Sequence, residues 1–354
     1  MTVYLLNIAL LLFWGAVLLW IKPTRRKRLW FCIIAALQWI LLSGLRAETV
    51  GADTVGYLRS FNEMKYTSLQ RQLQLCWDYL VHGAEAKDPG YGLLVKLFQY
   101  VSDNYQAFLF FVAAVFIISM TVWIYRNSAM PCLSFIIYSI LFYSFFSVTG
   151  HRQTLATALI VFVGYKYIKE RKLGRFLIIA FIAFMIHKSS LVFVPYYFIA
   201  NFELRLPYVS VAAVGIALCT VLGRALYGPL ASALGFSEGM IENAIGGAET
   251  FVVLMLSVCV LAFVLYPKIR QNRPDARFLY NLLLLTVLST LLVLQQQSFM
   301  RIQQYYSLVI MLVIPEFVLC VEKRYRPIVY TAGVAVMLFF FIRTDPFYQF
   351  FWQA

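Results

Sequence analysis

The 354-residue chain is 62% hydrophobic and only 13% charged, whereas a soluble domain typically carries about 25% charged residues. Apolar segments long enough to cross a bilayer follow one another almost end to end, and lipid offers the backbone no hydrogen-bond partners. These features exclude a separate soluble catalytic domain and predict a single all-α, polytopic membrane domain over residues 1–354. The net charge of +14 does not indicate nucleic-acid binding, because the basic residues lie between hydrophobic segments, as in membrane-protein loops.

The apolar segments predict about twelve membrane-spanning helices. The first is expected to be an uncleaved span rather than a signal peptide, because its basic cluster follows the apolar stretch instead of preceding it. The sixth and seventh are short and meet at His187 almost without a loop. In chain order, the predicted spans cover residues 2–21, 29–45, 105–125, 131–149, 153–168, 174–187, 189–204, 206–224, 250–267, 278–296, 303–321 and 327–342.

The distribution of Lys and Arg predicts the orientation of these helices. Residues 22–28, between the first two spans, carry five positive charges and no negative charge, which is typical of a cytoplasmic loop. With that loop inside, the alternating connections place 19 of the 30 Lys and Arg residues on the cytoplasmic side. Six of the other 11 lie in one long loop, where the orienting rule counts weakly. We therefore expect both termini to be external.

Two predicted external segments are long. Residues 46–104 hold seven acidic and six basic residues, and their mixed apolar and polar pattern predicts amphipathic helices over 57–81 and 91–101 that lie against the membrane surface. The run from Lys87 to Tyr91 between them has the composition of a turn. The second segment, 225–249, is rich in Gly and Ala.

Few charged residues lie close to the predicted external ends of the spans. Arg152, His187 and Arg301 come from three different helix ends on that side. Ionisable groups at membrane depth usually face a protein interior or a water-filled cavity, because exposing them to lipid is costly. A cluster of Arg and His side chains suits an anionic headgroup such as a phosphate or pyrophosphate. The remaining members of this external set are Arg46, Glu48, Asp53, His151, Lys188, Glu249 and Arg343.

Several short motifs, in order along most of the chain, resemble those of the EpsG family. These are multi-pass proteins placed among the Wzy-like polymerases of bacterial exopolysaccharide, capsule and O-antigen. Asp88 stands where relatives more often carry Glu, which leaves the role of that position open. The matching segments are Gly44-Leu45-Arg46, Gly51 to Tyr57, Asp88-Pro89-Gly90-Tyr91-Gly92, Gly150-His151-Arg152-Gln153, Ala183 to Ser190, and Arg301 with Tyr305-Tyr306.

The resemblance implies a GT-C-like enzyme of the bacterial cytoplasmic (inner) membrane, with its active site on the periplasmic or extracellular side. The implied reaction transfers a growing glycan from polyprenyl pyrophosphate to a sugar hydroxyl of the next lipid-linked unit. Negative charge grows on the leaving pyrophosphate, so fixed cations favour the transition state, and the acceptor hydroxyl needs a base. The expected partners are a polyprenyl-pyrophosphate-linked oligosaccharide and the lipid bilayer, with a chain-length regulator and a flippase as further candidates.

Three residues are candidates for the base. His187 is the first, because a histidine titrates near neutral pH and this one lies where two short spans meet. A lone histidine in an apolar helix is more often a structural hydrogen-bonding group, which is the competing interpretation. His151 and Asp53 are the alternative bases.

The cationic residues are candidates for substrate binding. Arg152 and Arg301 are expected to bind phosphate, against the alternatives of headgroup contact and helix packing. Arg46 either contacts phosphate beside Asp53 or forms a salt bridge with Asp53 that fixes the loop. The aromatic side chains that would stack on sugar rings, or else anchor helices at the interface, are Tyr57, Tyr91, Tyr305 and Tyr306.

The sequence predicts no metal site and no cofactor. No two histidines share helical i, i+4 spacing, and the acidic residues form no DxD-like cluster. A glycine-rich nucleotide loop is also absent, which favours a lipid-linked sugar donor over a sugar nucleotide.

Three other functions stay open. An O-antigen ligase-like or other lipid-linked glycosyltransferase would differ only in its acceptor. A glycolipid transporter predicts paired carboxylates or broken helices at the bilayer midplane, and the sequence indicates neither. A non-catalytic scaffold predicts that replacing Arg152, His187 or Arg301 leaves glycan length unaltered.

Overall fold

The computed structural model describes residues 1–21, 23–203, 249–295 and 297–353, and all regular structure in these ranges is helical. Six described helices are long and apolar enough to cross a membrane, and one bent pair is a seventh candidate. The all-α polytopic fold is thus confirmed, whereas the count of twelve spans is not. The predicted span 206–224 and almost all of the predicted loop 225–249 lie outside the described residues. The six long helices are α1 (Thr2–Leu19), α2 (Arg25–Gly44), α6 (Tyr105–Asn127), α14 (Glu249–Asn272), α15 (Ala276–Gln295) and α18 (Arg326–Ile342).

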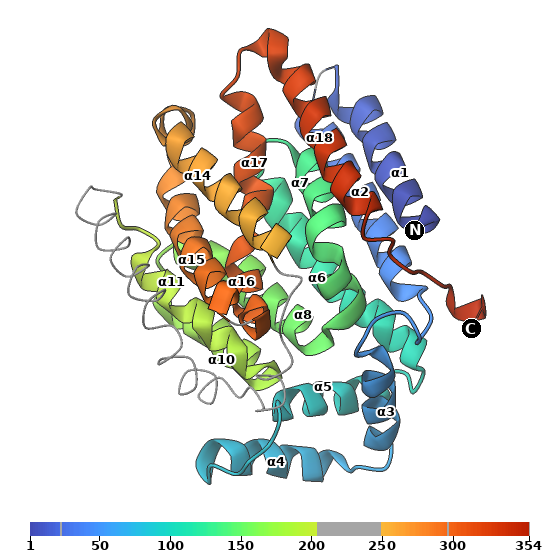
Figure 1. The fold of residues 1–354 in the computed structure, drawn as a ribbon. Coiled ribbons are helices and arrows are strands. Elements are labelled where there is room, and N and C mark those ends of the chain that lie inside the picture. The colour runs from blue at the N-terminus through green and yellow to red at the C-terminus, as the bar shows by residue number, and fades with distance from the viewer. Residues whose placement is uncertain (22, 204–248, 296, 354) are drawn as a thin grey trace. The chain divides into compact units, whose positions relative to one another are not determined.

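The described residues fall into two compact units. Unit 1 takes those of 1–165, 174–190 and 327–353, and unit 2 takes those of 166–173 and 191–326. In unit 1, α2 and α6 pack along each other (Figure 1). The side chains of Thr24 and Asn104 accept hydrogen bonds from backbone N–H groups of the first turns of α2 and α6, and so fix where these helices begin. Large buried side chains of this core are Phe31, Trp39, Phe108, Phe116, Phe135 and Tyr138.

Two of the predicted spans are interrupted by π-helical turns. Residues 131–149 form α7 (Pro131–Ile137), η1 (Tyr138–Phe142) and η2 (Ser144–Thr149), and residues 151–169 form α8 (His151–Thr157), η3 (Ala158–Val163) and α9 (Gly164–Lys169). A π turn leaves carbonyls without their usual partners. Here Ser43 Oγ donates to the Ser147 carbonyl at 2.6 Å and Thr54 Oγ1 to the Val148 carbonyl at 3.3 Å. These two carbonyls thus have side-chain partners; η2 ends at Thr149 and α8 begins at His151.

Three short helices follow α2. They are α3 (Thr54–Met64), α4 (Leu69–Val81) and α5 (Pro89–Gln99), and α4 and α5 lie across the direction of α6 in Figure 1. The single helix predicted over 57–81 is corrected to two, because Ser68 Oγ accepts from Arg71 N at 3.1 Å and begins a new helix. On α4, Leu73, Trp77 and Leu80 are exposed while Gln72 is buried, an outward apolar face that suits a lipid interface. That these helices lie on the membrane surface stays a prediction.

The segment after α18 returns to the beginning of the chain. We call residues 346–353 the C-terminal strap; it ends in the short helix η7 (Phe351–Gln353). The strap pairs with the residues after α2: Ala47 N donates to the Gln349 carbonyl at 2.8 Å and Phe351 N to the Leu45 carbonyl at 2.9 Å, on either side of an isolated bridge between Arg46 and Phe350. The backbone around Arg46 is therefore held from both sides, by α2 and by the strap.

Unit 2 is built around α14, α15 and a bent helical pair. The pair consists of α16 (Met300–Ser307) and α17 (Ile310–Leu319), which meet at 46°; the sequence did not predict this break. Arg273 donates to Asp275 at 2.8 Å and to Glu316 at 2.6 Å, while Lys169 contacts Asp275 at 2.7 Å. The shorter described helices of the chain are α10 (Leu173–Ile186), η4 (Lys188–Phe193), α11 (Val194–Ile199), η5 (Gln297–Phe299) and η6 (Lys323–Tyr325).

Candidate functional site

Asp88 lies in the turn that precedes α5 and takes a left-handed backbone conformation, with φ of 55°. Aspartate is among the few residues besides glycine that adopt this conformation readily, and the following proline has the fixed φ that suits a first helical turn. Gly90 then brings the N-terminus of α5 against the end of α10. A Cβ atom added at Gly90 would lie 2.6 Å from Met185 Cβ and 2.7 Å from the Met185 carbonyl oxygen. The local sequence thus places Asp88 next to the residues that follow α10.

This close approach gives a testable result. Gly90→Ala is expected to destabilise the protein by about 1–3 kcal/mol, because the new methyl group meets backbone and must push α5 away from α10. Gly56→Ala, in α3, is the matched control, since nothing lies within 4 Å of its added Cβ. Thermal unfolding of both variants in detergent measures the difference. Equal melting temperatures for the two variants would contradict the observed packing.

The Asp88 carboxylate gathers three donors. Its Oδ2 accepts from Arg152 Nη1 at 3.0 Å and from His187 Nδ1 at 3.0 Å, and its Oδ1 accepts from the backbone N–H of Lys188 at 3.2 Å. Burial raises the pKa of Asp88, but the hydrogen bond and charge of His187, the charge of Arg152 and the Lys188 N–H together lower it below its ordinary value. Asp88 is therefore an ionised, buried carboxylate that links α5, α8 and the end of α10.

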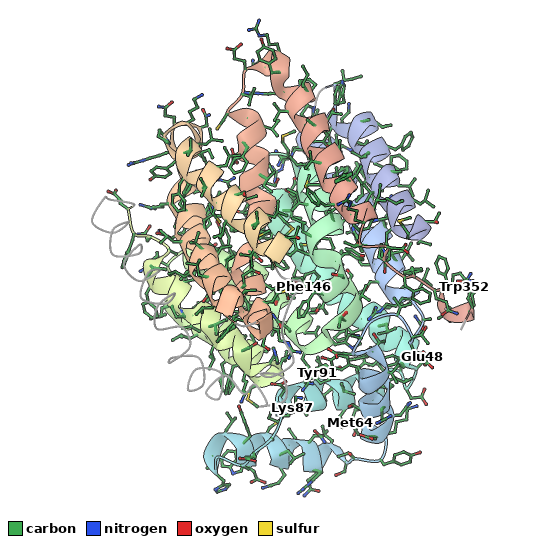
Figure 2. All side chains as sticks on the ribbon, viewed as in Figure 1. Glu48, Met64, Lys87, Tyr91, Phe146 and Trp352 are labelled. Atoms are coloured by element: carbon green, nitrogen blue, oxygen red, sulfur yellow. The ribbon has the colours of Figure 1, made fainter. Side chains whose placement is uncertain are left out.

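Arg152 lies between this carboxylate and two tyrosine rings. Its guanidinium carbon is 5.6 Å from the ring centre of Tyr57 and 5.9 Å from that of Tyr91, within the range of cation–π attraction. The two rings meet edge to face at 5.8 Å. Figure 2 labels Tyr91 at the start of α5. The Arg152 side chain keeps 22% exposure, so it is not completely enclosed by the protein.

A second pair, Arg46 and His151, supports the same tyrosine. The His151 ring stacks on Tyr57, with ring centres 4.3 Å apart and planes 14° from parallel. Arg46 Nη2 donates to His151 Nε2 at 2.9 Å, and Arg46 Nη1 donates to the Ser43 carbonyl. A guanidinium cannot accept a hydrogen bond, so His151 Nε2 is the unprotonated nitrogen and is already occupied. Both Arg46 and His151 are almost fully buried.

Only some of the residues predicted from the sequence lie together in the structure. It brings Arg46, Tyr57, Tyr91, His151, Arg152 and His187 together in unit 1, and we call these six with Asp88 the Asp88 cluster. Asp53 is exposed just before α3, whereas Arg46 hydrogen bonds to Ser43 and His151, so the proposed Arg46–Asp53 pair does not form among the described residues. Arg301 and Tyr305 belong to α16 of unit 2, where Arg301 is partly exposed and Tyr305 is buried.

Comparison with known proteins places the chain in a family. The family model described as the EpsG family matches residues 29–349. The chain belongs to the EpsG family. It is accordingly a membrane protein of the polysaccharide polymerase-like kind. No curated protein and no solved structure is significantly similar to it.

The Asp88 cluster shows what this EpsG-family protein can do chemically. Asp88 accepts from His187 Nδ1, which leaves Nε2 as the basic nitrogen of the neutral ring, and Nε2 makes no hydrogen bond within the described chain. The same carboxylate holds the guanidinium of Arg152, a partly exposed side chain, beside that imidazole. The cluster therefore combines a candidate base and a fixed cation. In the described ranges, no three His, Cys, Asp or Glu side chains gather as metal ligands would.

Sequence reasoning had singled out every member of the Asp88 cluster for a role except Asp88 itself. The run Lys87-Asp88-Pro89-Gly90 has the composition of a turn, and a polar residue in a turn is ordinarily solvated. Two signals were nevertheless present: an acidic residue directly before a Pro-Gly pair, and its place in a motif of the family. Its partner His187 is 99 residues away in the chain, a distance that no local pattern bridges.

Proposed function

We propose that this EpsG-family protein is a Wzy-type polymerase that joins lipid-linked oligosaccharide repeat units. In the proposed reaction the growing glycan leaves its polyprenyl pyrophosphate carrier and is transferred to a sugar hydroxyl of the next lipid-linked unit. The observation that carries the proposal is the Asp88 carboxylate. One of its two oxygens, Oδ2, accepts hydrogen bonds from both His187 and Arg152, at 3.0 Å each. A base and a cation fixed side by side are the two groups that this glycosyl transfer requires.

For each step of the proposed transfer, unit 1 contains a residue that could assist it. The bond between the anomeric carbon and the carrier's phosphate oxygen breaks, and the electron pair leaves with the pyrophosphate. Arg152, whose side chain is partly exposed, would stabilise that growing negative charge. The acceptor hydroxyl forms the new bond to the anomeric carbon, and its proton passes to His187 Nε2. Asp88 stabilises the imidazolium that results, as carboxylates do for histidine bases in other enzymes.

The geometry favours His187 over the two other candidate bases. His151 is almost fully buried and its Nε2 accepts from Arg46, so it has no basic nitrogen directed at a substrate hydroxyl. Asp53 is exposed and precedes α3 without a contact to Arg46 or His151 among the described residues. We assign Arg46 and His151 to positioning, because they hold the Tyr57 ring against which Arg152 lies.

The proposed place of the reaction is the outer face of the bacterial cytoplasmic membrane, with both termini external. The excess of Lys and Arg in alternate connections supports this orientation. Both lipid-linked substrates would arrive laterally in the bilayer, so their headgroups would meet the Asp88 cluster at the outer interface. A flippase would supply the substrates, and a chain-length regulator is a proposed partner.

Polymerisation by purified protein tests the proposal. Wild-type protein in lipid nanodiscs, given lipid-linked repeat units extracted from the host, is expected to produce a ladder of longer glycans. His187→Ala is expected to lower the initial rate by about 10²–10⁴-fold, the usual contribution of a general acid–base group. His82→Ala is the matched control, because His82 is exposed after α4, and it should leave the rate unchanged.

Other outcomes of the same assay would replace the proposal. If wild-type protein transfers glycan only to a different lipid acceptor, the chain is a ligase-like transferase. Movement of the lipid-linked unit across a vesicle membrane without a new glycosidic bond would identify a transporter. Full activity of His187→Ala would remove this residue as the base.

A further inference from the structure

Unit 2 contains a buried group of neutral polar side chains on one face of α16. Gln303 and Ser307 are four residues apart, and Gln304 lies beside them, so the three share a helix face. Their exposed fractions are 0%, 0% and 8%, respectively. We call Gln303, Gln304 and Ser307 the amide cluster. It lies outside the Asp88 cluster, and the mechanism proposed above does not use it.

Three oxygens of the amide cluster have no hydrogen-bond partner among the described residues: Gln303 Oε1, Gln304 Oε1 and Ser307 Oγ. The orientation of the Gln303 amide is fixed, because its Nε2 donates to Thr290 Oγ1 at 3.3 Å while Thr290 Oγ1 donates to the Thr286 carbonyl. A buried polar group without a partner costs the full loss of its hydration. Three such acceptors on one helix face are therefore an expensive arrangement unless a ligand supplies donors.

The hydroxyl side chains on the facing helix do have hydrogen-bond partners. On α15, which packs against α16, the hydroxyls of Thr286, Ser289 and Thr290 all donate to backbone carbonyls one turn earlier. These hydroxyls are structurally satisfied. One acceptor on α15 does lack a partner, Asn281 Oδ1, whose amide nitrogen donates to the carbonyls of Ala200 and Phe202, whereas α16 carries three such acceptors within five residues.

The amide cluster also lies where the helix is broken. Ser307 is the last residue of α16, and the axis turns by 46° before α17 begins at Ile310. At 1.5 Å per residue, the cluster occupies about 6 Å of helix directly before this break. Polar side chains and broken helices within membrane-spanning segments usually mark the path or binding site of a polar substrate.

We propose that the amide cluster is a saccharide-binding subsite that accepts hydrogen bonds from sugar hydroxyls. Acceptor oxygens without a charged group suit a neutral ligand with several O–H donors, and an anionic phosphate would be repelled by them. The inference rests on the proposed function, in which the substrate is an oligosaccharide. It assigns the binding of part of that glycan to unit 2. It depends only on contacts within unit 2.

Direct binding tests the subsite without catalysis. The probe is the free oligosaccharide released from the host's lipid-linked repeat units by mild acid, titrated into purified full-length protein in nanodiscs and followed by calorimetry. The double variant Gln303→Met/Gln304→Met, which keeps side-chain volume and removes both amides, is expected to bind at least tenfold more weakly than wild type. Thr286→Val is the matched control on the facing helix and should bind as wild type does.

The outcomes separate this inference from the proposed function. Undiminished binding by a folded double variant, or no binding by the wild type, would overturn the subsite even if polymerisation still depends on His187. Binding lost in the double variant, in a protein that forms no glycan ladder, would retain the subsite and overturn the polymerase. If the double variant does not fold, Ser307→Ala replaces it, with a severalfold loss of affinity expected and unchanged affinity counting against the subsite.

Discussion

Asp88→Asn is expected to lower the polymerisation rate by roughly 10³-fold, because the carboxylate that orients the His187 base would be lost. Asn keeps the size of Asp and tolerates the left-handed backbone at this position. The Asn amide, however, has only one acceptor oxygen, whereas the two carboxylate oxygens of Asp88 accept from three donors. If the amide oxygen faces His187 and Arg152, the amide NH₂ group faces the backbone N–H of Lys188, and two donors meet without an acceptor. If the amide is turned, the nitrogen opposes the donors of His187 and Arg152.

The turned amide has a further consequence for His187. Its Nδ1 would then have to accept a hydrogen bond, so the proton would move to Nε2 and the base would be lost. Initial rates with purified lipid-linked units measure the effect, and size-exclusion profiles show whether the variant is folded. Asp88→Glu is the control, because it keeps the negative charge and is expected to retain more activity than Asn. Equal rates for Asp88→Asn and the wild type would show that the carboxylate does not orient the base.

Arg152→Ala is expected to reduce chain elongation by about 10²–10³-fold, the usual loss when one donor to a developing anion is removed. The side chain is partly exposed, and its guanidinium is held by Asp88 and by the faces of Tyr57 and Tyr91. Its removal takes away the fixed cation beside His187. Polymer ladders from cells that carry the variant should shorten to single repeat units while the protein still inserts into the membrane.

Two further substitutions separate charge from geometry at this position. Arg152→Lys keeps the charge but not the planar fork, so intermediate elongation is expected. Arg59→Ala, at an exposed position of α3, should leave ladder length unchanged. Normal ladders in Arg152→Ala would refute the assignment of this cation and would favour a scaffold role.

Much of the fold could be read from the sequence, because spanning helices carry their own signal. The hydrophobic runs gave the positions of α1, α2, α6, α14 and α15 to within a few residues. The π-helical turns in residues 138–149 could not be predicted, since they depend on Ser43 and Thr54, roughly 100 residues away, donating to the carbonyls they free. The division between α3 and α4 was missed for a smaller reason, a serine cap within an otherwise amphipathic pattern.

The candidate site was predictable in its residue types and not in its connections. Arg152 and His187 stood out because charges near spans are few and costly. That one carboxylate joins them follows from the close packing at Gly90 and from the backbone conformation of Asp88, which no periodicity reveals. The sequence left His151 open as an alternative base to His187. Only the structure shows that Arg46 already occupies its Nε2.

The C-terminal strap has a consequence for how the protein is made. Arg46 lies in a turn whose backbone partners, Gln349 and Phe351, are some 300 residues further along the chain. During synthesis α2 enters the bilayer long before those residues exist. Until then, the Ala47 N–H and the Leu45 carbonyl lack these backbone partners. The positioning of His151 and Tyr57 would then be completed only after residues 349–351 have been synthesised and have paired with this turn.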